Sequence, residues 1–129
     1  MQNSLQGTKI DNKFLLQQIL GEGGLGVVYK AKQDELSRYV AIKILHQHCL
    51  SAEDNRTRFD REAKILSTLQ HPNIVSIYSY GDSDELCYIA MEYLEGKTLT
   101  QRINEGLGTD WKKSVEIVIQ LCDALDYAH

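Results

Sequence analysis

Four glycines fall within six positions of the sequence, in the segment GEGGLG at residues 21–26, and apolar residues lie on both sides of it. The flanking runs FLLQQIL (14–20) and VVYKA (27–31) are rich in aliphatic, β-branched and aromatic residues, which favour strands. The sequence therefore predicts two strands joined by a glycine-rich turn. Because glycine lacks a Cβ atom, such a turn also lets another molecule approach the backbone closely.

Three kinds of phosphate-binding loop compete for this segment. The P-loop pattern GxxxxGK[ST] fails, because the GKT at 96–98 has Met91, and not glycine, five residues before it. The dinucleotide fingerprint GxGxxG matches 21–26, but that motif must open a helix and VVYKA favours a strand. The spacing GxGxxGxV, completed by Val28, fits a glycine-rich hairpin that closes over a triphosphate. An ordinary glycine-rich β-turn is the alternative for the loop taken alone.

A lysine lies inside the next apolar run, YVAIKIL at 39–45. Strand alternation places Lys43 with Ala41 on one face and Val40 with Ile42 on the other, and both faces look buried. A buried ammonium group is costly unless it is paired. The alternative is a lysine at a sheet edge whose side chain reaches water.

The segment 51–70 predicts an amphipathic helix that supplies a partner for this lysine. Ser51 is a good N-cap, Glu53 and Asp54 suit the first turn, and Pro72 ends the helix. The apolar stripe is predicted to run through Phe59, position 62 or 63, Leu66 and Leu69, which directs Glu62 toward the core. We therefore favour a Lys43–Glu62 ion pair over a surface pair between Glu62 and Arg58.

The remaining elements are two more strands, at 74–80 and 86–93 with a turn between them, and helices at 99–106 and 111–129. Three strands, a helix, two strands and then helices predict an α+β unit with an antiparallel sheet. The last helix carries an apolar stripe made by Trp111, Val115, Val118, Leu121 and Leu125.

Composition excludes several classes of function. The net charge is −4 without a Lys/Arg block, so no nucleic-acid partner is expected. No apolar run approaches the roughly 20 residues of a membrane span. Three widely spaced cysteines fit reduced thiols and a cytoplasmic location. The HQHC at 46–49 resembles half of a metal site, but no second ligand pair follows, so no metal is expected there.

Five motifs occur in one order: the glycine loop, VAIK at 40–43, the Glu62 of FDREAKIL, HPNIV at 71–75 and YIAMEYLEG at 88–96. In this order they resemble the N-terminal lobe of a bacterial-type serine/threonine protein kinase. The resemblance implies a kinase-like α+β fold with a five-stranded antiparallel sheet, one long helix and two helices of an incomplete C-terminal lobe. The implied boundaries are an N-terminal extension (1–11), an N-lobe with hinge (12–94) and the start of the C-lobe (95–129).

The resemblance also implies an ATP site and a role for each of its residues. The glycine loop would cover the phosphates, and Lys43 would hold the α- and β-phosphates while paired with Glu62. Met91 would be the gatekeeper, and Leu66 and Ile77 would belong to the hydrophobic spine. Adenine would lie between Leu20, Val28 and Ala41, with hydrogen bonds to the hinge backbone at 92 and 94. The implied nucleotide-binding set is Leu20, Gly21, Glu22, Gly23, Gly24, Leu25, Gly26, Val28, Ala41, Lys43, Met91, Glu92 and Leu94.

The sequence lacks the family motifs HRDxxxxN, DFG and APE, which supply the catalytic base and the Mg²⁺ ligands. We therefore expect the ATP-binding half of a serine/threonine kinase, inactive as this chain alone. With Mg²⁺, the full-length kinase would transfer the ATP γ-phosphate to hydroxyl groups of a protein substrate. The alternative is a non-catalytic nucleotide-binding or interaction module, either a natural half-kinase or part of a pseudokinase. A dinucleotide-dependent oxidoreductase ranks third. Self-association through the last helix is expected if its stripe is exposed.

Overall fold

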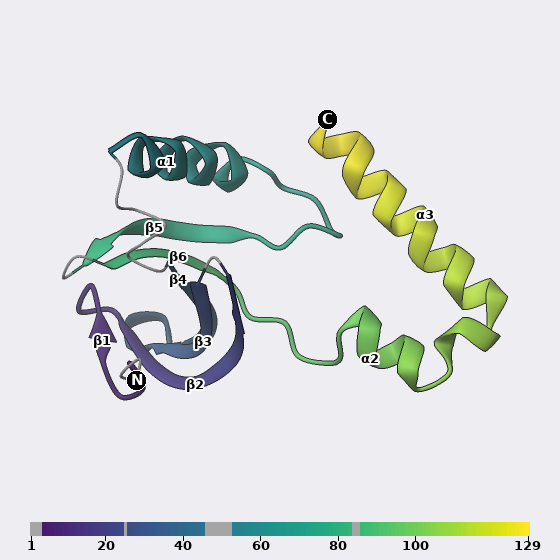
Figure 1. The fold of residues 1–129 in the computed structure, drawn as a ribbon, viewed down its shortest axis with the longest axis horizontal. Helices are drawn as coiled ribbons and strands as arrows, with labels where there is room; N and C mark the ends of the chain where they lie inside the picture. Colours follow the sequence, from purple (N-terminus) through teal and green to yellow (C-terminus); the bar gives the residue numbers. More distant parts are fainter. Residues whose placement is uncertain (1–3, 25, 46–52, 84–85) are drawn as a thin grey trace. The chain divides into compact units, whose positions relative to one another are not determined.

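The computed structural model describes residues 4–24, 26–45, 53–83 and 86–129 and divides the chain into two compact units (Figure 1). The first unit contains Met1–Thr68 and Ser76–Tyr93, and the second contains Leu69–Val75 and Leu94–His129. The predicted HQHC segment (46–49), Leu25 and the N-cap Ser51 lie outside the described residues.

The first unit is built on a six-stranded antiparallel sheet with the strand order β1-β2-β3-β4-β6-β5. The predicted glycine hairpin is confirmed, because β2 and β3 pair on either side of the loop. A 3₁₀ turn, η1, joins β3 to β4. The elements are β1 (Lys9–Ile10), β2 (Phe14–Gly23), β3 (Gly26–Gln33), η1 (Asp34–Leu36), β4 (Arg38–Leu45), β5 (Ile77–Ser83) and β6 (Leu86–Glu92).

Strand β4 supplies the centre of the hydrophobic core, and its alternation is as predicted. Val40, Ile42 and Ile44 are buried on one face and belong to the same core as Phe14 of β2 and Tyr88 of β6. Full burial of a side chain such as Ile42 contributes about 1.5–3 kcal/mol. The opposite face of β4 carries Tyr39, Ala41 and Lys43, which do not belong to this core.

The segment expected to be an N-terminal extension joins the sheet, which therefore has one strand more than the five expected. Ile10 on β1 is fully buried in the core, and Leu5 packs against the core. The turn after β1 places Asp11 and Asn12 at positive φ. There the Tyr88 hydroxyl donates a hydrogen bond to Oδ2 of Asp11 (2.9 Å), which fastens the turn to β6.

Strand β5 begins and ends later than predicted, over Ile77–Ser83 and not over 74–80. Ile74 is held in a turn, where its backbone N–H donates to the carbonyl of His71 (3.1 Å). At the other end, pairing continues through Asp82 opposite Cys87, so the strand extends into the predicted turn.

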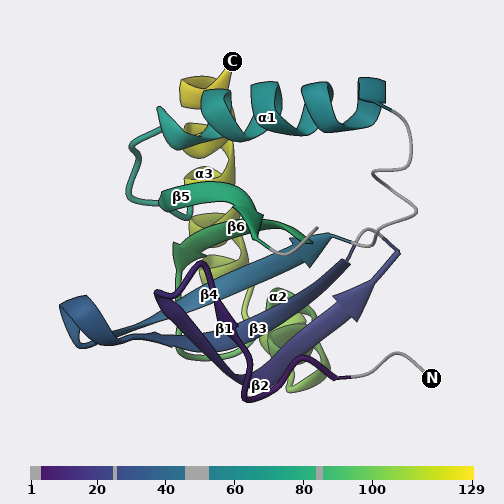
Figure 2. The ribbon, with the colours of Figure 1, turned by 90° about the vertical axis from the view of Figure 1, so that its left-hand side faces the viewer.

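Helix α1 (Glu53–Ser67) packs on β5, as Figures 1 and 2 both show. Its most buried described side chain is that of Ala63, which is 1% exposed. The predicted stripe is wrong in detail: Phe59 is only partly buried and Leu66 is 45% exposed. The helix therefore meets the sheet through a small side chain, which permits close approach.

The second unit contains α2 (Leu99–Asn104), η3 (Leu107–Thr109) and α3 (Trp111–Ala128). Thr98 and Gln101 form a capping box at the start of α2. The segment Leu69–Val75 docks on α3 through His71. The Asn73 N–H donates to Nδ1 of His71 (3.1 Å), so Nε2 carries the proton and donates to Asp123 (3.1 Å).

The apolar stripe of α3 is exposed, as expected for its sequence. Trp111 is 69% exposed and Leu125 is 63% exposed, and Val115, Val118 and Leu121 are exposed as well. None of the helices in the described ranges has the length and apolar character needed to cross a membrane.

The contact between Asp11 and Tyr88 predicts a pH-dependent contribution to stability. The Tyr88 hydrogen bond, helped by Lys13, lowers the pKa of Asp11, while burial raises the pKa of Tyr88 to about 12. A lowered carboxyl pKa stabilises the fold above the unfolded value, near pH 4, and this contribution is lost as pH falls through the folded value. Asp11→Asn should therefore cost stability at pH 7, by about 1 kcal/mol, and less at pH 2.5 in urea unfolding.

The matched variant Tyr88→Phe keeps the aromatic ring and removes the donor. In that background Asp11→Asn should have a smaller effect at pH 7 than in the unmodified chain. Equal effects of Asp11→Asn in the two backgrounds would contradict the assignment of this hydrogen bond.

Candidate functional site

Four of the predicted site residues lie on β3, β4 and β6, on the face of the sheet opposite the hydrophobic core. Val28 on β3 lies directly opposite Lys43 on β4, and Ala41 lies directly opposite Met91 on β6. Directly opposed residues in an antiparallel sheet place their Cβ atoms roughly 5 Å apart on the same face. We call this surface, defined by Val28, Ala41, Lys43 and Met91, the site face.

Lys43 is a half-buried cation among apolar neighbours. Its cross-strand partners are Val28 and Ile89, both partly buried. Among the described residues, no carboxylate lies within 4.0 Å of its ammonium group. Partial removal of a charge from water is unfavourable when nothing compensates it, so this position favours an anionic ligand.

A second lysine on the same face is placed differently. Lys30 lies opposite Ala41, and its ammonium group rests 4.3 Å from the ring centre of Tyr39 and 4.7 Å from that of Tyr93. These cation–π contacts satisfy Lys30 within the fold. This cluster leaves no pattern in the sequence, because its residues come from three separate segments.

The glycine loop lies at one end of the site face, since Gly26 pairs with Leu45, two residues beyond Lys43. A Cβ atom at Gly26 would overlap the backbone carbonyl of Ile44, so the fold itself requires glycine there. A Cβ atom at Gly21, Gly23 or Gly24 would meet no atom within 4 Å. The fold does not require these three glycines, which suits a ligand that approaches the loop from outside.

Leu20 and Glu22, the other described loop residues that the resemblance assigned to the nucleotide, are both exposed. Leu20 falls in a register shift between Ile19 and Gly21, and it is 42% exposed. Such bulges redirect side chains. Glu22 is exposed and lies opposite Val27 in the hairpin, while Leu25 is outside the described residues.

The predicted hinge residues belong to different units. Met91 and Glu92 belong to the first unit, which ends at Tyr93, and both are partly buried, whereas Leu94 belongs to the second unit and is exposed. The Glu92 N–H donates to the carbonyl of Ser76 (2.9 Å), and the Ser76 N–H donates to the Glu92 carboxylate (3.3 Å). Since its N–H is occupied, Glu92 could offer a nucleobase its carbonyl oxygen alone.

Glu62 does not face the core, which corrects the predicted orientation. Its side chain is exposed on α1, and the described residues contain no ion pair of Glu62 with Lys43 or with Arg58. The physical reason is the phase of the helix, which turns Ala63 toward the sheet in place of Glu62. Leu66 is exposed and Ile77 partly buried, so spine packing at these two positions stays a prediction.

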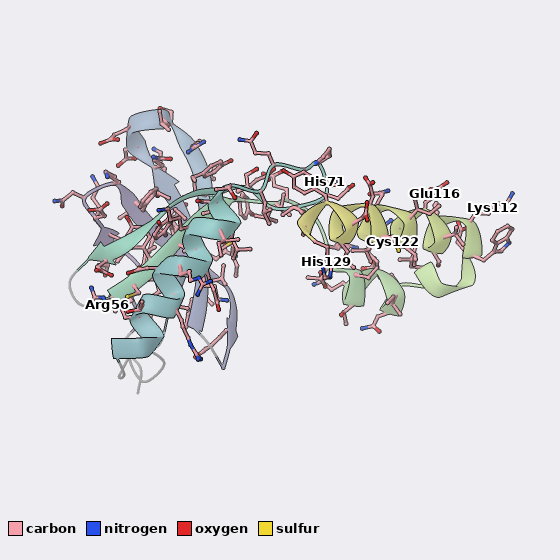
Figure 3. All side chains as sticks on the ribbon, turned by 90° about the horizontal axis from the view of Figure 1, so that it is seen from above. Arg56, His71, Lys112, Glu116, Cys122 and His129 are labelled. Atoms are coloured by element: carbon pink, nitrogen blue, oxygen red, sulfur yellow. The ribbon has the colours of Figure 1, made fainter. Side chains whose placement is uncertain are left out.

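An ion pair that the sequence analysis missed connects α1 to the sheet. Arg56, labelled in Figure 3, pairs with the Asp82 carboxylate on β5. The thiol of Cys87 donates to the other oxygen of Asp82 (3.2 Å). Burial and the Asp82 carboxylate raise the pKa of Cys87 to about 11, so the sulfur stays protonated at neutral pH and remains a donor.

Residues 14–129 match the family described as Protein kinase domain. The chain belongs to the protein kinase family. It is 40% identical over 125 residues to the serine/threonine-protein kinase PrkC of Bacillus subtilis, covering 97% of this chain and 19% of the relative. It is 38% identical over 124 residues to the serine/threonine-protein kinase pkn3 of Myxococcus xanthus, covering 95% and 23%.

Solved structures agree with this family assignment. The kinase domain of Mycobacterium tuberculosis PknI superposes with a TM-score of 0.78 at 28% identity, covering 96% of this chain and 50% of that one. The six-stranded sheet with α1 therefore has the protein kinase N-lobe fold that the sequence predicted. The chain spans about a fifth of the length of these curated relatives.

The surroundings of the loop glycines predict different effects of two glycine-to-alanine substitutions on the unfolding free energy. Gly26→Ala should destabilise the chain by about 1–3 kcal/mol, because its methyl group overlaps the β4 backbone. Gly21→Ala, the matched control, should change the unfolding free energy by no more than about 0.5 kcal/mol. Urea unfolding checks both, and equal losses of stability would contradict the distinction.

Proposed function

We propose that this chain binds ATP on the site face and is the nucleotide-binding half of a serine/threonine protein kinase. The observation that carries the proposal is the arrangement of the glycine loop and Lys43 on one face, with Lys43 free of any ion pair in the described part of the chain. Family membership adds support, since protein kinases in general use ATP and Mg²⁺.

The site face suits a nucleoside triphosphate, because the glycine loop and Lys43 lie toward one end of it and apolar residues lie beside them. Loop glycines with open space would let backbone N–H groups approach the phosphates, and the ammonium group of Lys43 would neutralise part of their charge. Val28, Ala41 and Met91 would provide the apolar surface for the base. We retain Glu62 as the partner of Lys43 in the nucleotide-bound state, which requires α1 to move from its present position.

We assign the phosphoryl transfer to the full-length kinase of which this chain would be the ATP-binding half. With Mg²⁺ bound, that protein would transfer the γ-phosphate of ATP to serine or threonine hydroxyls of a protein substrate. We place it in the cytoplasm, in keeping with the reduced cysteines. We retain the proposed boundary between residues 94 and 95, whereas the start of the N-lobe moves from residue 12 to include β1. The break between compact units after Tyr93 supports the boundary between the lobes. Self-association through the exposed stripe of α3 also stays a proposal, which light scattering would test.

ATP binding is tested by nuclear magnetic resonance titration of the ¹⁵N-labelled chain with Mg·ATP. We expect shifts at the loop and around Lys43, and at least about tenfold weaker binding in Lys43→Met, because a charged hydrogen bond to phosphate is lost. The exposed Lys32→Met variant on β3 is the matched control and should bind normally. Unchanged spectra at millimolar ATP, or tighter binding of NADH than of ATP, would contradict the proposal.

Phosphoryl transfer by the isolated chain is expected to be absent. The sequence contains no HRD, DFG or APE motif, so the catalytic base and the Mg²⁺ ligands of the family are missing from it. Positioning and metal-borne charge stabilisation account for nearly all catalysis in this reaction class. Incubation with radiolabelled ATP and a generic protein substrate should give no label above background. Label that disappears in Lys43→Met would refute this expectation and the alternative of a non-catalytic module.

A further inference from the structure

Helix α1 is anchored to the sheet at a distance from Lys43. Its ion pair, between Arg56 and Asp82, is made on β5, the edge strand of the sheet. Strand β6 separates β5 from β4, so two strand spacings, or roughly 10 Å, lie between the anchoring strand and the strand of Lys43.

The anchor and Lys43 nevertheless share one face of the sheet. Lys43 lies opposite Ile89, which in turn lies opposite Tyr80 on β5. Asp82 is two residues beyond Tyr80, and side chains two apart on a strand point to the same face. Helix α1 therefore rests on the face that carries Lys43, but toward its β5 edge (Figure 2).

The phase of the helix separates Glu62 from this contact. At 100° per residue, positions 56 and 63 fall on nearly the same side of α1. Arg56 reaches Asp82 and Ala63 is buried, so this side is the one that faces the sheet. Glu62 is one residue before Ala63, about a quarter turn away, and is exposed.

Asp82 is held in place by partners from two elements. Arg56 of α1 binds Oδ2, and the Cys87 thiol of β6 donates to Oδ1 (3.2 Å). Asp60, one turn after Arg56 on α1, is a further acidic group that acts on Arg56. The carboxylate of Asp82 is therefore oriented by the β5–β6 hairpin before the helix adds its guanidinium group.

We propose that Arg56 and Asp82 form a latch that competes with the Lys43–Glu62 ion pair. For Glu62 to reach Lys43, α1 has to rotate and move from β5 toward β4, and this motion takes Arg56 away from Asp82. Arg56 and Asp82 are thus positioning residues that hold Glu62 away from Lys43. The inference rests on the proposed function only for the role given to the Lys43–Glu62 pair.

The test measures contact between Lys43 and Glu62 directly and without nucleotide, so a failure of ATP binding would not affect it. A carbodiimide joins a carboxylate and an amine that touch, and mass spectrometry quantifies the Lys43–Glu62 product. The Lys97–Glu105 pair of the second unit, with 2.6 Å between its charged atoms, is the internal standard. We use the ratio of the Lys43–Glu62 product to the Lys97–Glu105 product. Loss of the latch should raise this ratio about two- to five-fold, as expected for an exposed ion pair.

Asp82→Asn and Arg56→Gln each remove one side of the latch, and both residues are exposed enough for the fold to persist. Asp34→Asn is the matched control, because Asp34 is an exposed carboxylate paired with Lys9 and Lys32 away from α1. The ratio should rise in both latch variants, stay unchanged in the control and return to its original value in the double exchange Arg56→Asp with Asp82→Arg.

An unchanged ratio in both latch variants, with helix content retained by circular dichroism, would overturn the proposal. An equal rise in Asp34→Asn would also overturn it, since the effect would then reflect net charge. A complete absence of the Lys43–Glu62 product in every variant, with the internal standard present, would show that releasing the latch does not bring Glu62 to Lys43.

Discussion

The alternation of side chains along β4 is the constraint on which the rest of the first unit depends. Val40 and Ile42 are fully buried on one face, and this burial supplies the centre of the core. Ala41 and Lys43 necessarily point the other way, onto the face shared with α1 and the glycine loop. A shift of one residue in the pairing with β3 would exchange the two faces, so core stability also fixes the position of the candidate site.

The two lysines on the site face differ in how their charges are compensated. Lys30 is enclosed by the rings of Tyr39 and Tyr93, and its charge is balanced within the fold. Lys43 has apolar cross-strand neighbours, and no ion pair is made to it in the described ranges. This contrast identifies Lys43 as the position at which an anion gains most from binding.

Local pattern was sufficient to predict the hairpin, the face of Lys43 and the order of the elements from β2 onward, because each depends on neighbours in the sequence. Strand β1 was not predicted. The phase of α1 was not predictable in this way. Phe59 and Leu66 indicated one stripe, but the helix packs through Ala63 and is fixed by Arg56, whose partner is 26 residues away. The hydrogen bond from Tyr88 to Asp11 likewise joins residues 77 apart and leaves no signal in either segment.

The contrast between Gly26 and the preceding glycines also has a consequence for protein engineering. Gly26 is fixed by the backbone of β4, whereas side chains at 21, 23 and 24 would enter open space. The glycine that the fold requires and the glycines that we propose face the nucleotide are therefore separated within a few positions of one loop. A combinatorial library confined to positions 21, 23 and 24 would therefore vary the proposed ligand-facing side of the loop without placing a Cβ atom against the rest of the fold.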